Sequence, residues 1–170
     1  MRKSASLLGT NIPLVEAAHH GGRQRPTAIL LRTSWTTGEG GAANAIAQTW
    51  HNVNNRVDSC HYVVDEAQVI RCVPDKIQAF HLAKEYKGAI SINVCHNPPQ
   101  GPDVATVLRA AKLTARLCKL YRIPVKMLRL SEEERWLRHP WKSRGGIILR
   151  TSGDFPIDKF FDFVEAKYRQ

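Results

Sequence analysis

The stretch SCHYVVDEAQVIRCVPDKIQAFHL, residues 59–82, decides which kind of fold this 170-residue chain can adopt. Two runs rich in β-branched residues, HYVVD at 61–65 and QVIRCV at 68–73, are separated by only two residues. This spacing predicts an antiparallel hairpin. The following QAFHL at 78–82 is a short strand or a loop. The centre of the chain is therefore rich in strands, and we expect the helices in the flanking sequence.

Upstream of this centre, the sequence predicts one buried strand and one helix. The run AILLR at 28–32 is continuously apolar until it ends in an arginine, which is typical of a buried strand. Three glycines between 38 and 41 predict a loop, and AANAIAQTWH at 42–51 has the composition of a helix. Residues 1–26 are predicted to form an irregular N-terminal arm, followed by a single domain over 27–170.

Directly downstream, the sequence predicts another strand and a long helix. The run AISINVC at 89–95 alternates apolar and polar residues, which is the period of a half-buried strand. Asp103 is placed to cap a helix that reaches Tyr121, because apolar residues between them recur at helical spacing. These apolar positions are expected to belong to the core.

The last third of the chain predicts two more helices and one strand. Ser131 is followed three residues later by Glu134, a capping-box pattern that predicts the start of a short helix. The run GIILR at 146–150 repeats the pattern of an apolar strand that ends in arginine. A final helix is predicted from residue 157 to residue 168.

This order of elements predicts one α/β domain with a central mixed β-sheet flanked by helices. Arg32 and Arg150 are each the last residue of an apolar strand. Since functional sites in open α/β sheets gather at the carboxyl ends of strands, we expect both arginines to point into one site.

The composition favours anionic partners but does not choose among them. The formal net charge is +10, which attracts nucleotides, nucleic acid or an anionic cell wall. Zinc-finger, RNA-recognition and Walker signatures are missing from the sequence, so sequence-specific binding of nucleic acid is not expected. The four cysteines form no CxxC pair. No apolar run approaches the length of a membrane span or a signal-peptide core, so we expect a cytoplasmic protein without membrane contact.

Several of these segments also carry a resemblance to a known family. In order, they read AILLRTS, SCHYVVD, VIRCVP, AFHL, SINVC and GIILRTSGDFPIDKF. This series resembles the zinc-dependent N-acetylmuramoyl-L-alanine amidases, the family of phage endolysins and peptidoglycan recognition proteins. The resemblance spans about residues 12–164 and implies the amidase-type α/β fold. It also implies that His61 and His81 match positions that line the family's substrate groove.

The resemblance breaks down at the zinc ligands. The two positions that match the family's zinc-binding histidines are Arg32 and Arg150, and the loop 151–154 offers no clear counterpart of the third ligand. In the family, the segment that corresponds to SINVC contains the motif "GIE". The glutamate of this motif is matched with Cys95. Arginine has no lone pair for a metal and stays protonated at any working pH. We therefore predict no resident metal, no cofactor and no catalytic residue in this region.

The main hypothesis is a non-catalytic binding protein. Its ligand would occupy the cleft in which the family binds zinc, and which here carries the positive charge of two arginines. The residues predicted to contact its ligand are Arg32, Arg150, Trp35, Tyr62, His61, His81 and Cys95. Planar guanidinium groups suit phosphate or carboxylate, so the expected ligand is an anionic small molecule. A phosphorylated nucleotide, sequestered by a phage protein, fits best, and a peptidoglycan fragment is the other ligand considered.

Three alternatives remain open at this stage. The arginines could be neutralised by nearby acids, for which Asp65, Asp154 and Asp158 are candidates. His61, Tyr62 and other predicted contact residues could be ordinary core residues. The chain could also be an active endolysin, an N-acetylmuramoyl-L-alanine amidase that holds zinc through ligands placed elsewhere. The oligomeric state has no signal in the sequence.

Overall fold

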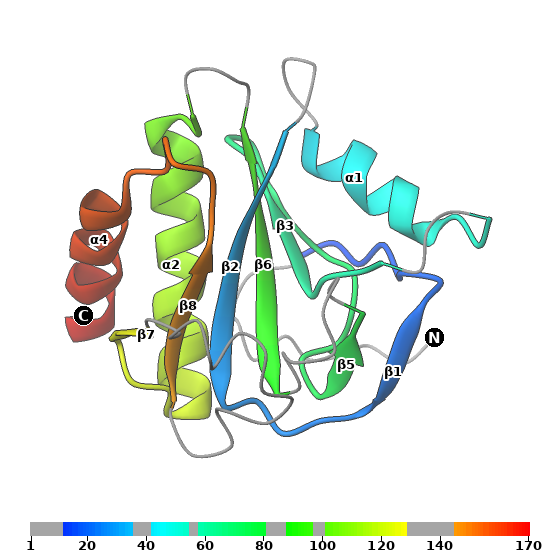
Figure 1. Cartoon of the computed structure of the whole chain (residues 1–170), viewed down its shortest axis with the longest axis horizontal. Coiled ribbons are helices and arrows are strands. Elements are labelled where there is room, and N and C mark those ends of the chain that lie inside the picture. Colours follow the sequence, from blue (N-terminus) through cyan, green and yellow to red (C-terminus); the bar gives the residue numbers. More distant parts are fainter. Residues whose placement is uncertain (1–11, 36–41, 55–57, 81–87, 97–100, 129–144) are drawn as a thin grey trace.

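A computed structural model describes residues 12–35, 42–54, 58–80, 88–96, 101–128 and 145–170 of the chain. Within these residues lie two sheets and three helices (Figure 1). The strands are β1 (His20–Arg23), β2 (Ala28–Trp35), β3 (Tyr62–Val64), β4 (Val69–Arg71), β5 (Ile77–Ala79), β6 (Ala89–His96), β7 (Met127–Leu128) and β8 (Gly146–Arg150). The helices are α1 (Ala42–His51), α2 (Val104–Tyr121) and α4 (Ile157–Arg169).

The main sheet has six strands in the order β4-β3-β6-β2-β8-β7. All neighbouring strands pair in parallel except β3 and β4, which form the antiparallel hairpin expected from the sequence. The predicted α/β domain with a mixed central sheet is therefore confirmed. A second sheet of two strands pairs β1 with β5.

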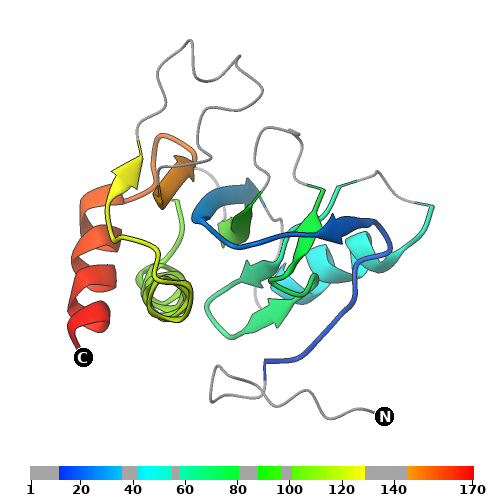
Figure 2. The ribbon, with the colours of Figure 1, turned by 90° about the horizontal axis from the view of Figure 1, so that it is seen from below.

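Helices cover the two faces of the main sheet (Figures 1 and 2). Helices α2 and α4 pack on one face, where the large apolar cluster includes Ile29, Ile92 and Phe160. Helix α1 packs on the other face beside β3 and β4, where a smaller cluster includes Val63 and Trp50. The sheet is thus the middle layer of a three-layer domain.

Strand β6 differs from its prediction as a half-buried strand. All eight of its residues are buried, including Ser91 and Asn93. The alternation of polar and apolar residues is real, but both faces of this strand are covered because it lies in the middle of the sheet. Polar side chains buried at such a position need hydrogen-bond partners, and this requirement shapes the site described below.

The helix predictions agree well with the structure. Helix α1 has the predicted bounds, and α2 runs from Val104 to Tyr121 with Asp103 as its N-cap. Helix α4 begins at Ile157 as expected and extends one residue further, to Arg169. The short helix predicted from the capping box at Ser131 lies outside the described residues.

The N-terminal segment is more ordered than the sequence predicts. Strand β1 lies within the stretch expected to be irregular, and the amides of Val15 and Ala17 donate to the carbonyls of Arg71 and Cys72. Ala17 is also part of the core beneath α1. The expectation of an irregular arm is therefore wrong for this part, because its backbone is held by pairing with residues that are distant in the sequence.

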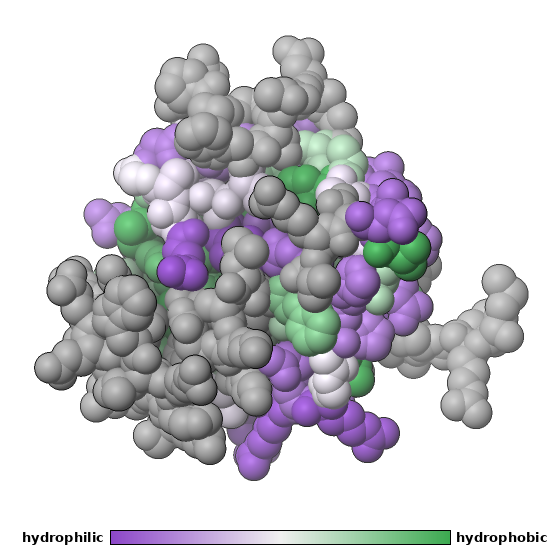
Figure 3. All heavy atoms as spheres, turned by 45° about the vertical axis from the view of Figure 1, so that its right-hand side comes forward, coloured by the Kyte–Doolittle hydropathy of each residue, from purple (hydrophilic) through white to green (hydrophobic). Residues whose placement is uncertain are grey.

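The described surface carries no single large apolar area in the view of Figure 3, where hydrophobic residues form small separate groups among hydrophilic ones. The most exposed large hydrophobic residues, such as Val53, Val104 and Leu14, come from different parts of the fold. Among the described residues, no helix combines the length and the apolar character needed to cross a membrane.

Removing the cap of α2 tests how the longest helix is stabilised. The Asp103 carboxylate accepts from the Thr106 amide at 2.8 Å and from the Thr106 hydroxyl at 2.9 Å. We expect Asp103→Ala to lower the free energy of unfolding by about 1 kcal/mol, because these two donors lose their partner. Urea unfolding measures the change. Asp162→Ala, at an exposed position within α4, should change it by less than about 0.5 kcal/mol. Equal losses in both variants would contradict the capping role.

Candidate functional site

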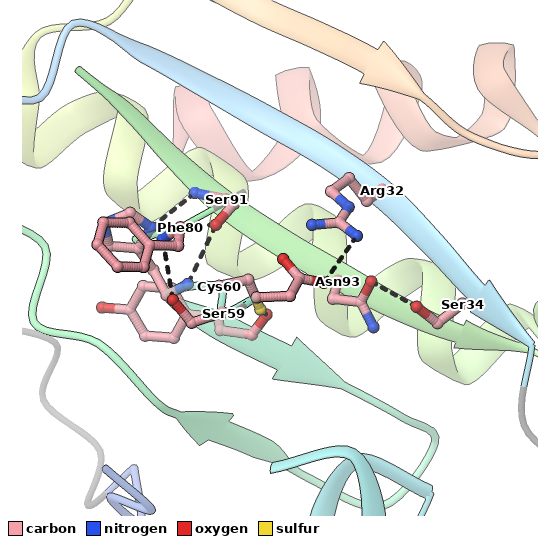
Figure 4. A network of polar contacts seen from close by, with 10 residues as sticks. Arg32, Ser34, Ser59, Cys60, Phe80, Ser91 and Asn93 are labelled. Atoms are coloured by element: carbon pink, nitrogen blue, oxygen red, sulfur yellow. Dashed lines mark hydrogen bonds and ion pairs between the residues drawn. The ribbon is translucent and has the colours of Figure 1, made fainter. Parts of the chain in front are cut away.

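Two arginines lie side by side at the end of the main sheet where β2, β6 and β8 reach their carboxyl ends, here called the carboxyl edge. Arg32 on β2 pairs in register with Arg150 on β8 and with Asn93 on β6. Residues paired in parallel strands point to the same face, so these three side chains form one row. Figure 4 shows the Arg32 guanidinium beside Asn93. The arginine pair, Arg32 and Arg150, therefore lies on one face of the sheet, and the expectation that both point into one ligand site stays a prediction.

Arg32 is held by a carboxylate that the sequence analysis did not consider. Its Nη2 lies 3.6 Å from Oδ2 of Asp58, and both side chains are largely buried, with 14% and 15% of their surface exposed. Burial raises the pKa of the Asp58 carboxyl, and the positive charge of Arg32 opposes this shift. None of the three acids considered from the sequence makes this contact with Arg32; Asp58 makes it.

Among the described residues, three buried polar atoms around Arg32 find no hydrogen-bond partner. They are Nη1 of Arg32, Nδ2 of Asn93 and Oδ1 of Asp58. The other amide atom of Asn93, Oδ1, accepts from the Ser34 hydroxyl at 2.8 Å, which fixes the orientation of the amide. Leaving such groups unpaired costs about 1–3 kcal/mol each. Two of the three are donors, so the row is suited to receive an acceptor such as an anion.

Asn93, rather than Cys95, is the β6 residue beside Arg32. Cys95 pairs in register with Ser34, one row further along, and its side chain packs with the apolar cluster beneath α1. Burial raises the pKa of the Cys95 thiol to about 12, so it stays uncharged at neutral pH. The match of the family's "GIE" glutamate with Cys95, and the contact of Cys95 with a ligand, stay predictions.

His61 is a core histidine, not a contact residue. Its ring is fully buried, the Ser91 amide donates to Nδ1 at 3.0 Å, and Nε2 lies 2.9 Å from the Ile77 carbonyl. These partners define a neutral ring whose Nε2–H donates to the carbonyl. Burial lowers the pKa of His61 to about 4. The interpretation of His61 as a ligand contact is therefore wrong in the described structure, because every side of the ring is occupied.

Tyr62 points away from the arginine pair. It belongs to the cluster on the α2 face of the sheet, whereas Arg32 follows Leu31 and so projects from the opposite face. The Tyr62 hydroxyl donates to Asp75 at 2.6 Å, and Tyr121 donates to the other oxygen of Asp75 at 2.7 Å. This carboxylate ties β3 to the end of α2. The role of Tyr62 is structural, and the prediction that it contacts the same ligand as Arg32 was wrong.

Two predicted contact residues are left untested. Trp35 is the last residue of β2, next to His96 in register, but its side chain is outside the described part. His81 also lies outside the described residues. Their proposed contacts stay predictions.

The two residues matched with the family's zinc histidines, Arg32 and Arg150, do not suit zinc, and the absence of a resident metal stays a prediction. Both side chains at the matched histidine positions are guanidinium groups, which carry positive charge and offer no lone pair. Within the described ranges, no three His, Cys, Asp or Glu side chains are grouped as metal ligands. The match of Arg32 and Arg150 with the family's zinc histidines remains a prediction. The donors present at this edge suit an anion.

The fold and the position of the site define a small α/β domain of the peptidoglycan amidase type. The family described as N-acetylmuramoyl-L-alanine amidase matches residues 22–144. The chain belongs to this family. Among curated proteins, no sequence matches the chain.

Solved structures share this fold at low sequence identity. The catalytic domain of XlyA is 19% identical with a TM-score of 0.65, covering 91% of this chain and 99% of that one. A mutant of PlyL is 15% identical with a TM-score of 0.65, covering 92% and 99%. The hydrolase AmiA of Staphylococcus aureus, solved with its ligand, is 12% identical with a TM-score of 0.64, covering 94% and 83%. At such identities the likeness establishes the fold alone.

The buried ring of His61 makes the stability of the fold depend on pH. The folded pKa of about 4 lies below the ordinary value of 6.5, so the neutral ring stabilises the fold above pH 6.5. This contribution is lost as the pH falls from 6.5 to 4, and it amounts to roughly 3 kcal/mol. Urea unfolding between pH 4 and pH 7 measures it. His61→Gln should remove this part of the pH dependence, and the exposed His20→Gln should keep it. An unchanged pH dependence in His61→Gln would contradict the assignment.

Proposed function

We propose that this chain binds peptidoglycan fragments, and that the arginine pair at the carboxyl edge holds a carboxylate of the muramoyl peptide. The observation that carries the proposal is the row formed by Arg150, Arg32 and Asn93, in which Nη1 of Arg32 and Nδ2 of Asn93 find no partner among the described residues. The family match supplies the class of ligand, because its described activity concerns the bond between N-acetylmuramic acid and L-alanine.

The chemistry of this row suits a carboxylate. An arginine offers several N–H donors in one plane and can pair with both oxygens of a carboxylate, and an amide N–H can donate to either. The ion pair with Asp58 holds the guanidinium of Arg32 in place, so less side-chain freedom is lost when a ligand binds. Arg150 is exposed and supplies a second positive charge next to it.

The comparisons favour a peptidoglycan ligand over a nucleotide. A phosphorylated nucleotide was the best fit from charge alone, but no finding beyond the two guanidinium groups supports it. The family of N-acetylmuramoyl-L-alanine amidases supports the muropeptide, the second ligand that the sequence analysis considered. Both ligands are anionic, and the binding test below separates them.

Changing Arg150 is the sharpest test of binding, because this residue is exposed and its loss leaves the buried ion pair intact. We expect Arg150→Gln to weaken binding of a muramoyl dipeptide with a free carboxylate by about 10- to 100-fold, the usual loss for a charged hydrogen bond. Titration calorimetry measures the affinity. Arg169→Gln, at the exposed end of α4, is the matched control and should bind like the wild type.

The ligand itself provides the second control. The same dipeptide with its carboxylate converted to an amide should bind the wild type as weakly as the free acid binds Arg150→Gln. Equal affinity for the acid and the amide would overturn the proposed contact. Tighter binding of a nucleotide than of either dipeptide would favour the nucleotide hypothesis instead.

The family match favours a second function, hydrolysis of the amide between N-acetylmuramic acid and L-alanine. The structures of similar fold include the catalytic domain of XlyA and an endolysin from Bacillus subtilis. Such hydrolysis would make the chain an active endolysin, the alternative considered from the sequence. It requires groups beyond the row of Arg32, Asn93 and Arg150, which offers donors but no base and no nucleophile.

Metal content separates binding from zinc-dependent hydrolysis. From the donor set at the carboxyl edge, we expect purified, untagged protein to hold far less than one equivalent of zinc. Elemental analysis measures this, and a chelator should leave muropeptide affinity unchanged. One equivalent of zinc, together with release of L-alanine-terminated peptides from cell walls that stops with chelator, would instead establish the amidase.

A further inference from the structure

A serine, a histidine and an aspartate meet at the carboxyl edge. The proposed function does not use them, and the sequence analysis considered only the aspartate, Asp154, as an acid that could neutralise an arginine. His96 is the last residue of β6, and Ser152 and Asp154 lie in the loop between β8 and α4. The Ser152 hydroxyl lies 3.3 Å from Nε2 of His96, and Nδ1 of His96 lies 3.9 Å from Oδ2 of Asp154. This is the order of groups found in serine hydrolases.

The strands hold the serine in position. Thr33 on β2 donates its hydroxyl hydrogen to the Ser152 oxygen at 3.3 Å, and the Ser152 amide donates back to the Thr33 oxygen at 2.8 Å. This reciprocal pair fixes both the backbone and the side chain of Ser152 against β2. Since the oxygen already accepts from Thr33, the hydrogen of the Ser152 hydroxyl remains to be donated to another acceptor.

His96 and Asp154 are placed to receive that proton and to support the ring. His96 is only 4% exposed, so its ring has little freedom to turn. When Nε2 accepts from Ser152, the ring hydrogen is on Nδ1, the nitrogen that faces Asp154. A hydrogen bond from Ser152 lowers the pKa of the Asp154 carboxyl, which is therefore negative at neutral pH. The Ser152 hydroxyl has one hydrogen, which it can donate either to Asp154 or to Nε2 of His96. Only donation to His96 activates the serine, so the proposed reaction requires the hydroxyl to turn from Asp154 to His96.

We propose that Ser152 is a nucleophile for acyl transfer, with His96 as its base and Asp154 as the residue that positions His96. The substrate class is a carboxylic ester or amide. The Ser152 oxygen bonds to the acyl carbon while its proton passes to Nε2 of His96. The carbon–oxygen or carbon–nitrogen bond to the leaving group then breaks, and that group takes the proton from His96. Water, deprotonated by His96, attacks the acyl-serine and releases the acid and the free hydroxyl.

This site is distinct from the row of Arg32, Asn93 and Arg150. Thr33 lies on β2 directly after Arg32, and successive residues of a strand point to opposite faces. The acyl site thus lies toward the α2 face of the edge and the arginine pair on the other face. The inference does not depend on the binding of peptidoglycan or on a metal. Contacts of about 3–4 Å between catalytic groups without substrate are usual, and they tighten on binding.

A fluorophosphonate probe tests the nucleophile directly. The probe forms a bond between its phosphorus and the serine oxygen, fluoride leaves, and the proton passes to the base. We expect the wild-type chain to be labelled at Ser152, located by mass spectrometry of its peptides. Ser152→Ala should not be labelled, and Thr151→Ala, with the neighbouring hydroxyl removed, should be labelled like the wild type. Wild-type protein without a label at Ser152 would overturn the proposal.

Two further variants test the roles of the partners. His96→Gln should slow labelling by about 100-fold or more, the usual contribution of a general base. Asp154→Asn should slow it by at least about 10-fold, and by up to about 10⁴-fold if Asp154 supports the ring as a triad aspartate does. The melting temperature should stay unchanged, since the residue is exposed. Unchanged labelling rates in folded His96→Gln would refute the base. If His96→Gln does not fold, Asp154→Asn decides whether the ring is positioned for catalysis.

Discussion

The parallel pairing of β2 between β6 and β8 is the constraint on which the rest of this structure depends. It brings together residues that are far apart in the chain and aligns them row by row, so that Arg32 lies between Asn93 and Arg150. The same pairing places Thr33 beside the loop that carries Ser152. Both candidate sites are consequences of this register, and a shift by one residue would turn every side chain of β2 to the opposite face.

The positive charge of Arg32 is largely buried and therefore needs an opposite charge and hydrogen-bond acceptors. The surrounding residues supply only some of them. Asp58 pairs with Arg32, but one nitrogen of the guanidinium and one oxygen of the carboxylate find no partner in the part of the chain that the structure describes. Replacing a buried pair of this kind by apolar residues is often neutral or stabilising, so stability alone does not account for it. A ligand that accepts from Arg32 and Asn93 would complete the hydrogen bonding, which is why the unpaired donors carry the proposed function.

The two faces of the carboxyl edge offer different chemistry. On the face of the arginine pair, fixed positive charge favours binding of an anion, and the Asp58 carboxylate is held in an ion pair with Arg32. On the α2 face, His96 and Ser152 offer a base and a nucleophile that need no metal. This member of the N-acetylmuramoyl-L-alanine amidase family thus has described residues at this edge whose chemistry suits anion binding and, in our proposal, acyl transfer. A family match alone does not reveal this division, because it depends on which side chains occupy shared strand ends.

Local patterns in the sequence determined the class of fold, the bounds of α1 and α2, the Asp103 cap and the placing of both arginines at strand ends. These features depend on periodicity, capping and neighbouring residues, and the family motifs are equally local. Only the tertiary structure decided that β6 is buried on both faces, that Asn93 lies beside Arg32, that Asp58 is its partner, and that His61 and Tyr62 are core residues. It also brought Ser152 to His96, which is 56 residues away in the sequence. Such contacts arise from strand order and register, which are set by the packing of the whole sheet between its helices and leave no signal near the residues concerned.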